Sequence, residues 1–143
     1  MNRIAILNGP NLNLLGTREP EVYGSKSLKE LEASWVAFGE LHAVEIVCFQ
    51  SNVEGELVDA IQDYGFEVDA ILINPGGYTH TSVAIRDAIA AVDAPVYEVH
   101  ISHPDAREDF RKTSLVRPVC AGAISGLGVR GYKAVLEVLI NVE

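Results

Sequence analysis

Short apolar runs alternate with helix-forming segments along the whole chain, and this alternation restricts the fold more than any other feature. The runs are apolar at successive positions rather than at every second one, as in strands buried on both faces of a parallel sheet. They lie at 3–7, 45–49, 70–73, 96–99 and 119–124. Apolar residues recur at helical spacing over about 28–41, 54–64, 81–92 and 129–142. The sequence therefore predicts five parallel strands with helices on both faces.

Length and composition are those of one globular domain. The chain has 143 residues, of which 48% are hydrophobic and 22% charged. We expect residues 1–143 to form a single doubly wound, flavodoxin-like α/β domain with strand order 2-1-3-4-5. The net charge of −9 disfavours nucleic acid and membrane as partners. Because no apolar run is long enough for a signal peptide or a membrane span, we expect a cytoplasmic protein. Cys48 and Cys120 are expected to be buried reduced thiols.

Polar residues follow the predicted strands. In a sheet of this kind, ligands bind where the carboxyl ends of the strands meet loops, near the reversal of strand order between the first and third strands. The segments at these ends are rich in Asn, Ser and His, which recognise hydroxyl and carbonyl groups better than polyphosphate. They lie at 8–11, 50–52, 74–80, 98–103 and 125–128. We therefore expect a site for a small polar molecule at this edge.

The long loop after the first strand carries a candidate base, Tyr23. A tyrosine hydroxyl has a reference pKa of about 10, so it needs help to act as a base near neutral pH. A nearby guanidinium favours the phenolate, and Arg18 lies upstream on the same loop. The alternative is that Tyr23 packs as a lid side chain while Arg18 pairs with Glu19 or Glu21.

The fourth strand carries a candidate acid. Alternation along the strand places Glu98 and His100 on the same side, so the carboxylate can orient the imidazole for general acid catalysis. Alternatively, His100 is a structural residue at a strand end. A metal site built from His80, His100 and His103 is less well supported, because no Cys or carboxylate ligand with recognisable spacing accompanies them.

Other strand-end residues have both functional and structural interpretations. Asn74 and His80 bracket a turn that offers polar groups to a ligand, although turn chemistry and a helix cap also explain it. Asp87 is expected to be exposed on a monomer, as a solvated charge or as part of a neighbouring subunit's site. One of Arg107 and Arg111 can reach the cleft, although charges in such segments usually face solvent.

Residues 126–131, Gly-Leu-Gly-Val-Arg-Gly, match the G-x-G-x-x-G pattern of dinucleotide sites. The match follows the last strand rather than the first, and no later strand with a ribose-binding acid is expected. We therefore interpret it as a tight turn with close helix packing.

Six segments from the first strand to the last helix are long enough to compare with known families. They are NGPNLNLLGTREPEVYG (8–24), FQSNVEGELVDAIQ (49–62), INPGGYTHTSVAIRDAI (73–89), VYEVHIS (96–102), REDFRKTS (107–114) and GLGVRGY (126–132). Together they resemble the type II 3-dehydroquinate dehydratases. The resemblance implies a hydro-lyase of the shikimate pathway, which leads to chorismate and the aromatic amino acids. Such an enzyme converts 3-dehydroquinate to 3-dehydroshikimate and water through an enolate.

The resemblance also implies a role for each matching residue. Tyr23 is the proton acceptor, Arg18 stabilises the transition state, and a water near Asn11 stabilises the enolate. His100, positioned by Glu98, is the proton donor. The implied substrate-binding residues are Asn74, His80, Asp87, Ile101, Ser102 and Arg111.

The family's known assembly implies a homododecamer of trimers, with Asp87 lent across an interface and no metal or organic cofactor. The chain departs from the usual pattern at Val53, Gln62 and His103. Because His103 adjoins the implied carboxylate-binding backbone, we expect any difference first in substrate affinity or its pH dependence. Its lysines lie in charged or helix-surface contexts, which disfavours a Schiff-base route. The alternatives are a non-catalytic flavodoxin-like binding or assembly module, or the same reaction used in quinate catabolism.

Overall fold

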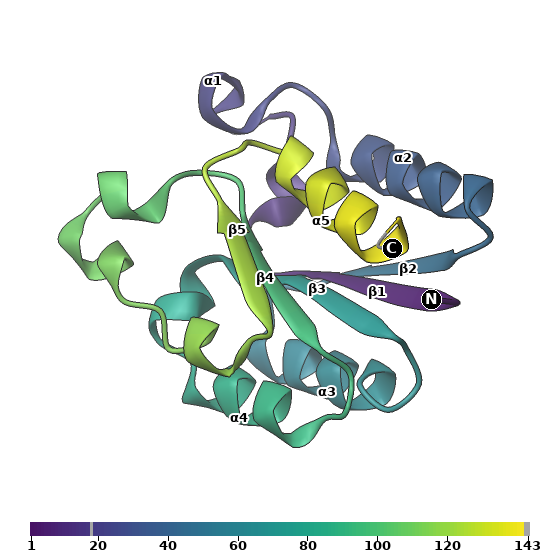
Figure 1. Ribbon diagram of the computed structural model, residues 1–143. Helices are drawn as coiled ribbons and strands as arrows, with labels where there is room; N and C mark the ends of the chain where they lie inside the picture. Colours follow the sequence, from purple (N-terminus) through teal and green to yellow (C-terminus); the bar gives the residue numbers. More distant parts are fainter. Residues whose placement is uncertain (18, 142–143) are drawn as a thin grey trace.

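Within the described residues, 1–17 and 19–141, five parallel strands form one sheet in the order β2-β1-β3-β4-β5 (Figure 1). At Val22 and Tyr23 the description covers the backbone alone. The structure is a computed structural model. Its strands are β1 (Arg3–Asn8), β2 (Glu45–Gln50), β3 (Ala70–Asn74), β4 (Val96–His100) and β5 (Gly122–Ser125). The predicted fold class and strand order are confirmed.

Helices cover both faces of the sheet (Figure 1). They are α2 (Leu28–Leu41) and α5 (Arg130–Ile140) on one face, and α3 (Glu54–Tyr64) and α4 (Val83–Ala91) on the other. Each face has its own apolar core, with the Trp35 and Tyr132 rings stacked at 4.5 Å on the first and Leu57 packed with Ile85 on the second. Burying each such side chain contributes about 1.5–3 kcal/mol to folding. No helix in the described part of the chain is both long and apolar enough to cross a bilayer.

Serine caps fix the start of two helices. The Ser27 hydroxyl caps α2 by accepting a hydrogen bond from the Glu30 backbone N–H at 3.1 Å, and it donates to the Glu30 carboxylate at 3.2 Å. Ser82 caps α4 by accepting from the Ile85 N–H at 2.9 Å. The fourth helix therefore begins at Val83, later than predicted.

The connections differ most from the prediction. The fifth strand was expected to begin at 119 but begins at Gly122, because Arg117–Val119 form a 3₁₀ turn closed by a hydrogen bond from the Cys120 N–H to the Arg117 carbonyl at 3.0 Å. Pro118 favours that turn, since its fixed φ suits a helical start. The loop after β1 contains a 3₁₀ turn at Leu12–Leu14 and a short helix, α1 (Pro20–Tyr23).

Both cysteines are free and partly buried. Burial raises the pKa of each thiol to about 12, helped by Glu32 at Cys48 and by Glu98 at Cys120. The thiols are therefore protonated at neutral pH.

The glycine-rich segment after β5 forms the predicted tight turn. Gly126 and Gly128 have φ of +83° and +65°, which favours glycine at both positions. Their N–H groups donate to the Ser102 and Ile101 carbonyls, each at 3.0 Å. The segment thus anchors the turn that follows β4.

Candidate active site

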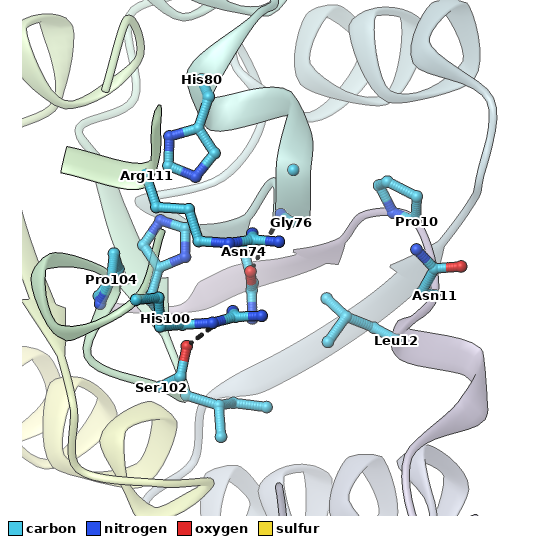
Figure 2. Close-up of a pocket in the computed structure, with 13 residues that line it drawn as sticks. Pro10, Asn11, Leu12, Asn74, Gly76, His80, His100, Ser102, Pro104 and Arg111 are labelled. Atoms are coloured by element: carbon cyan, nitrogen blue, oxygen red, sulfur yellow. Dashed lines mark hydrogen bonds between the residues drawn. The ribbon is translucent and has the colours of Figure 1, made fainter. Parts of the chain in front are cut away.

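The loops at the carboxyl ends of β1, β3 and β4 enclose a pocket of about 150 Å³. Figure 2 shows His80, His100 and Arg111 on one side of it, with Pro10 and Asn11 opposite. The pocket brings together predicted residues from four separate stretches of the chain, namely Asn11, Asn74, His80, His100, Ile101, Ser102 and Arg111. The pocket lies at the edge of the sheet where the sequence predicted a site.

The loops after β1 and β3 cross in close contact beneath the pocket. The Gly9 N–H donates to the Asn74 carbonyl at 2.8 Å, and a Cβ atom at Gly9 would lie 2.7 Å from the Pro75 carbonyl oxygen. Asn11 follows in the left-handed region with φ of 72°, and its N–H donates to Asn52 Oδ1 at 3.0 Å. These contacts place Asn11 at the pocket wall.

Asn74 is held by a chain of buried hydrogen bonds. Its Oδ1 accepts from the Gly76 N–H at 3.1 Å, and its Nδ2 donates to the Tyr132 hydroxyl at 2.9 Å. That hydroxyl donates to Asn8 Oδ1 at 2.6 Å, while Asn8 Nδ2 is buried with no partner among the described residues. Burial raises the pKa of Tyr132 well above its usual range, so the phenol remains a donor. The orientation of the Asn74 amide is therefore fixed from behind.

Glu98 and His100 form the pair that strand alternation predicted. Glu98 is fully buried, and its Oε2 lies 2.6 Å from His100 Nε2. The same oxygen accepts hydrogen bonds from the Thr79 and Ser114 hydroxyls, while Oε1 lies 3.2 Å from Arg117 Nε. Because Nε2 is bound to the carboxylate, Nδ1 is the ring nitrogen available to a ligand in the pocket.

The environment of Glu98 keeps it ionised. Burial acts to raise its pKa, but the hydrogen bond and charge of His100, the Thr79 hydroxyl and the Arg117 guanidinium together hold the pKa below its ordinary value. A buried carboxylate of this kind is a fixed negative charge that orients the imidazole.

The pocket wall is cationic although the chain is acidic overall. Arg107 and Arg111 both line it, together with His80. Arg107 Nη1 donates to Ser102 Oγ at 3.2 Å, and Arg111 Nε lies 3.1 Å from Glu108 Oε1. Such a wall suits an anionic ligand, because clefts lined by one sign of charge concentrate the opposite sign.

Some predicted residues do not line this pocket. Asp87 is exposed on α4 and outside the lining, as predicted, which fits both a solvated charge and a residue of a neighbouring subunit's site. Arg18 lies outside the described residues, as does the side chain of Tyr23, whose backbone ends α1. His103 is exposed and its Cβ approaches Gly126, outside the lining.

The model of the family described as Dehydroquinase class II matches residues 2–140. The chain belongs to the class II dehydroquinases. It is 51% identical over 142 residues to the 3-dehydroquinate dehydratase of Halothermothrix orenii, a match that covers 99% of this chain and 96% of the relative. It is 50% identical over 143 residues to that of Bacillus licheniformis, covering 100% and 99%.

Solved structures of type II dehydroquinases have the same fold as this class II dehydroquinase. The enzyme from Butyrivibrio crossotus superposes with a TM-score of 0.93 and 44% identity, covering 96% of this chain and 97% of the other. That from Propionibacterium acnes superposes with a TM-score of 0.94 and 36% identity, covering 99% and 97%.

Several residues of this dehydroquinase site were missed or left open by sequence reasoning. Arg107 was weighed only as an alternative to Arg111, yet both line the pocket. Tyr132 and Arg117 contact Asn74 and Glu98 from behind, and neither has a sequence signal that marks it as part of the site. Within the described residues, no group of three or more His, Cys, Asp or Glu side chains is placed to hold a metal ion.

Proposed function

We propose that the pocket dehydrates 3-dehydroquinate to 3-dehydroshikimate through an enolate. The chain is a 3-dehydroquinate dehydratase, a lyase acting on a small molecule. The observation that carries the mechanism is the buried Glu98 carboxylate bound to His100 beside a cationic wall. The curated relatives cited above, named 3-dehydroquinate dehydratases, support the same reaction.

Tyr23 removes the proton from the carbon next to the substrate's ketone. Arg18 favours the Tyr23 phenolate and stabilises the negative charge that develops. The electron pair moves onto the ketone oxygen, and a water held near Asn11 donates a hydrogen bond to the resulting enolate.

His100 completes the elimination as general acid. Glu98 binds Nε2, so the proton passes from Nδ1 to the departing hydroxyl. The enolate collapses as the carbon–oxygen bond breaks, which gives the conjugated enone and one water. Tyr23 and His100 then exchange protons with solvent to restore their starting states.

Substrate contacts follow from the pocket wall. The Ile101 and Ser102 N–H groups bind the carboxylate, while their carbonyls are bound by Gly128 and Gly126. The remaining proposed contacts are Asn74, His80 and Arg111 of the same chain and Asp87 of a neighbouring one. The proposed assembly is a dodecamer of trimers. Each chain is one catalytic domain spanning residues 1–143, located in the cytoplasm, working without metal or organic cofactor and serving aromatic biosynthesis.

Absorbance of the product tests this proposal. The purified protein is mixed with 3-dehydroquinate and a chelator, and the assay is repeated after borohydride treatment with substrate present. The enone band is expected to grow at a rate that neither the chelator nor the borohydride treatment changes. Inhibition by borohydride would indicate a Schiff base, inhibition by chelator would indicate a metal, and no enone from folded protein would leave only a binding module.

Tyr132→Phe is expected to raise KM several-fold and to lower the free energy of unfolding by about 1–3 kcal/mol. The ring still stacks on Trp35, but the Asn74 amide loses one of the two partners that fix its orientation, which leaves its Nδ2 without an acceptor among the described residues. Steady-state kinetics and urea unfolding measure the two effects. Tyr97→Phe is the control, because the Tyr97 hydroxyl bonds no described residue. An unchanged KM in Tyr132→Phe would show that Asn74 does not need this contact.

The position of His103 changes the expectation drawn from the sequence: His103→Asn is expected to leave KM within about twofold and the pH profile in place, because its side chain lies against Gly126 outside the pocket lining. Surface substitutions of this kind have small effects. A larger rise in KM, or a moved pH limb, would show that His103 does reach the bound carboxylate.

A further inference from the structure

Arg117 lies on the far side of Glu98 from the pocket. Its Nε is 3.2 Å from Glu98 Oε1, whereas His100 binds the other carboxylate oxygen. Arg117 is outside the pocket lining and its side chain is 42% exposed. The guanidinium can therefore act on a bound substrate only through Glu98 and His100.

Hydrogen bonds hold the backbone that leads into Arg117. Ser114 Oγ accepts from the Arg117 N–H at 2.9 Å and also contacts the Thr79 hydroxyl at 2.7 Å. The Leu115 N–H donates to the Thr79 carbonyl at 2.7 Å, and the Leu115 carbonyl accepts from Arg86 Nη1 at 2.8 Å. The 3₁₀ turn thus presents Arg117 to Glu98 in a defined position.

The other groups around Glu98 are neutral or titrate. Thr79 and Ser114 contribute hydroxyls, and the Cys120 thiol is protonated at neutral pH because burial raises its pKa to about 12. The arginines that line the pocket, Arg107 and Arg111, both pair with Glu108 instead. Among the described residues, Arg117 is the permanent cation in direct contact with the buried carboxylate.

We propose that Arg117 is a positioning residue for the catalytic acid, whose guanidinium holds the Glu98 carboxylate ionised and oriented so that His100 is presented to the substrate. The proposal rests on the proposed function. It assigns a role in the reaction to a residue that does not touch the substrate.

Arg117→Gln removes the positive charge and keeps a polar side chain. The Glu98 carboxylate then protonates at higher pH, so the acid limb of kcat/KM is expected to move up by about half a pH unit. The shift is kept small because Arg117 is partly solvent-exposed. Arg117→Lys retains the charge, so its acid limb of kcat/KM is expected to lie at the same pH as in the wild type. If the acid limb of kcat/KM lies at the same pH in the wild type and in both variants, the proposal is overturned.

The pH dependence of the free energy of unfolding tests the proposal without an activity assay. A carboxylate with a lowered pKa stabilises the fold above its unfolded value of about 4.3, and this stability is lost as pH falls through the folded pKa. The destabilisation by Arg117→Gln is therefore expected to be present at pH 7 and to shrink below about pH 4. A pH-independent loss would indicate a packing role instead.

Repeating the substitution in a Glu98→Gln background tests whether Arg117 acts through Glu98. There, Arg117→Gln is expected to change neither the pH profile nor the pH dependence of stability. A shift that persisted would show that Arg117 does not act through Glu98. This background also serves if Arg117→Gln alone fails to fold, since the buried charge is gone. An inactive wild type with the expected stability data would count against the proposed function and not against the Arg117–Glu98 coupling.

Discussion

Replacing His100 by asparagine is expected to lower kcat by roughly 10²–10⁴-fold, with only a few-fold change in KM. Asparagine can still donate a hydrogen bond from this position, but it cannot deliver a proton to the departing hydroxyl. Proton removal by Tyr23 does not depend on His100. The variant is therefore expected to incorporate solvent deuterium at the carbon next to the ketone while forming little enone.

Two assays on one sample check this expectation. The enone band gives kcat and KM, and nuclear magnetic resonance in deuterium oxide follows exchange at the carbon. His42→Asn is the matched control, because His42 is an exposed residue at the end of α2 that packs on Phe38 with ring centroids 4.7 Å apart. A loss below tenfold, or loss of exchange together with turnover, would argue against His100 as a separate general acid.

The parts of the structure that the sequence predicted depend on short-range periodicity. Apolar runs are long enough to mark β1, β3 and β4, and parallel strands bring their carboxyl ends to one edge. The period of two along β4 is sufficient to pair Glu98 with His100, which the structure places 2.6 Å apart. Both inferences require only neighbours on one element.

The missed parts depend on contacts that no local pattern encodes. The Tyr132 hydroxyl reaches Asn8 across 124 residues, because α5 packs in the same apolar cluster as Ile4 and Ile6 of β1. Arg117 reaches Glu98 from a 3₁₀ turn that ends at Val119, the residue at which the last strand was predicted to begin. Here Pro118 and the hydrogen bonds of Ser114 outweighed β-propensity.

These missed contacts are hydrogen bonds and ion pairs to two buried polar side chains of the site. Asn74 and Glu98 are polar and buried, and an unsatisfied group at either position destabilises the fold by about 1–3 kcal/mol or more. Each has a partner outside the pocket lining, Tyr132 for Asn74 and Arg117 for Glu98. The same contacts that satisfy burial also fix the orientation of groups facing the pocket.

Replacing Glu98 by alanine is expected to lower the free energy of unfolding at pH 7 by about 3 kcal/mol, the lower end of the range for breaking a buried ion pair. The lower end applies because Arg117 can still reach solvent. Since the pKa of Glu98 is lowered in the fold, the difference from wild type is expected to shrink as pH falls below about 4.

Urea unfolding at pH 7 and at pH 3.5 to 4 measures this difference, with Glu45→Ala as the matched control. Glu45 also pairs with an arginine, Arg3 at 3.3 Å, but its side chain is 63% exposed, so its loss is expected to lower stability by less than about 1 kcal/mol. Similar losses for the two variants would mean that the buried network adds no more than an exposed ion pair. A large loss at Glu98 that persists unchanged at low pH would assign the effect to the cavity rather than to the charge. The expected pattern, large at neutral pH and smaller in acid, would tie the stability of the fold to the ionised carboxylate that orients His100.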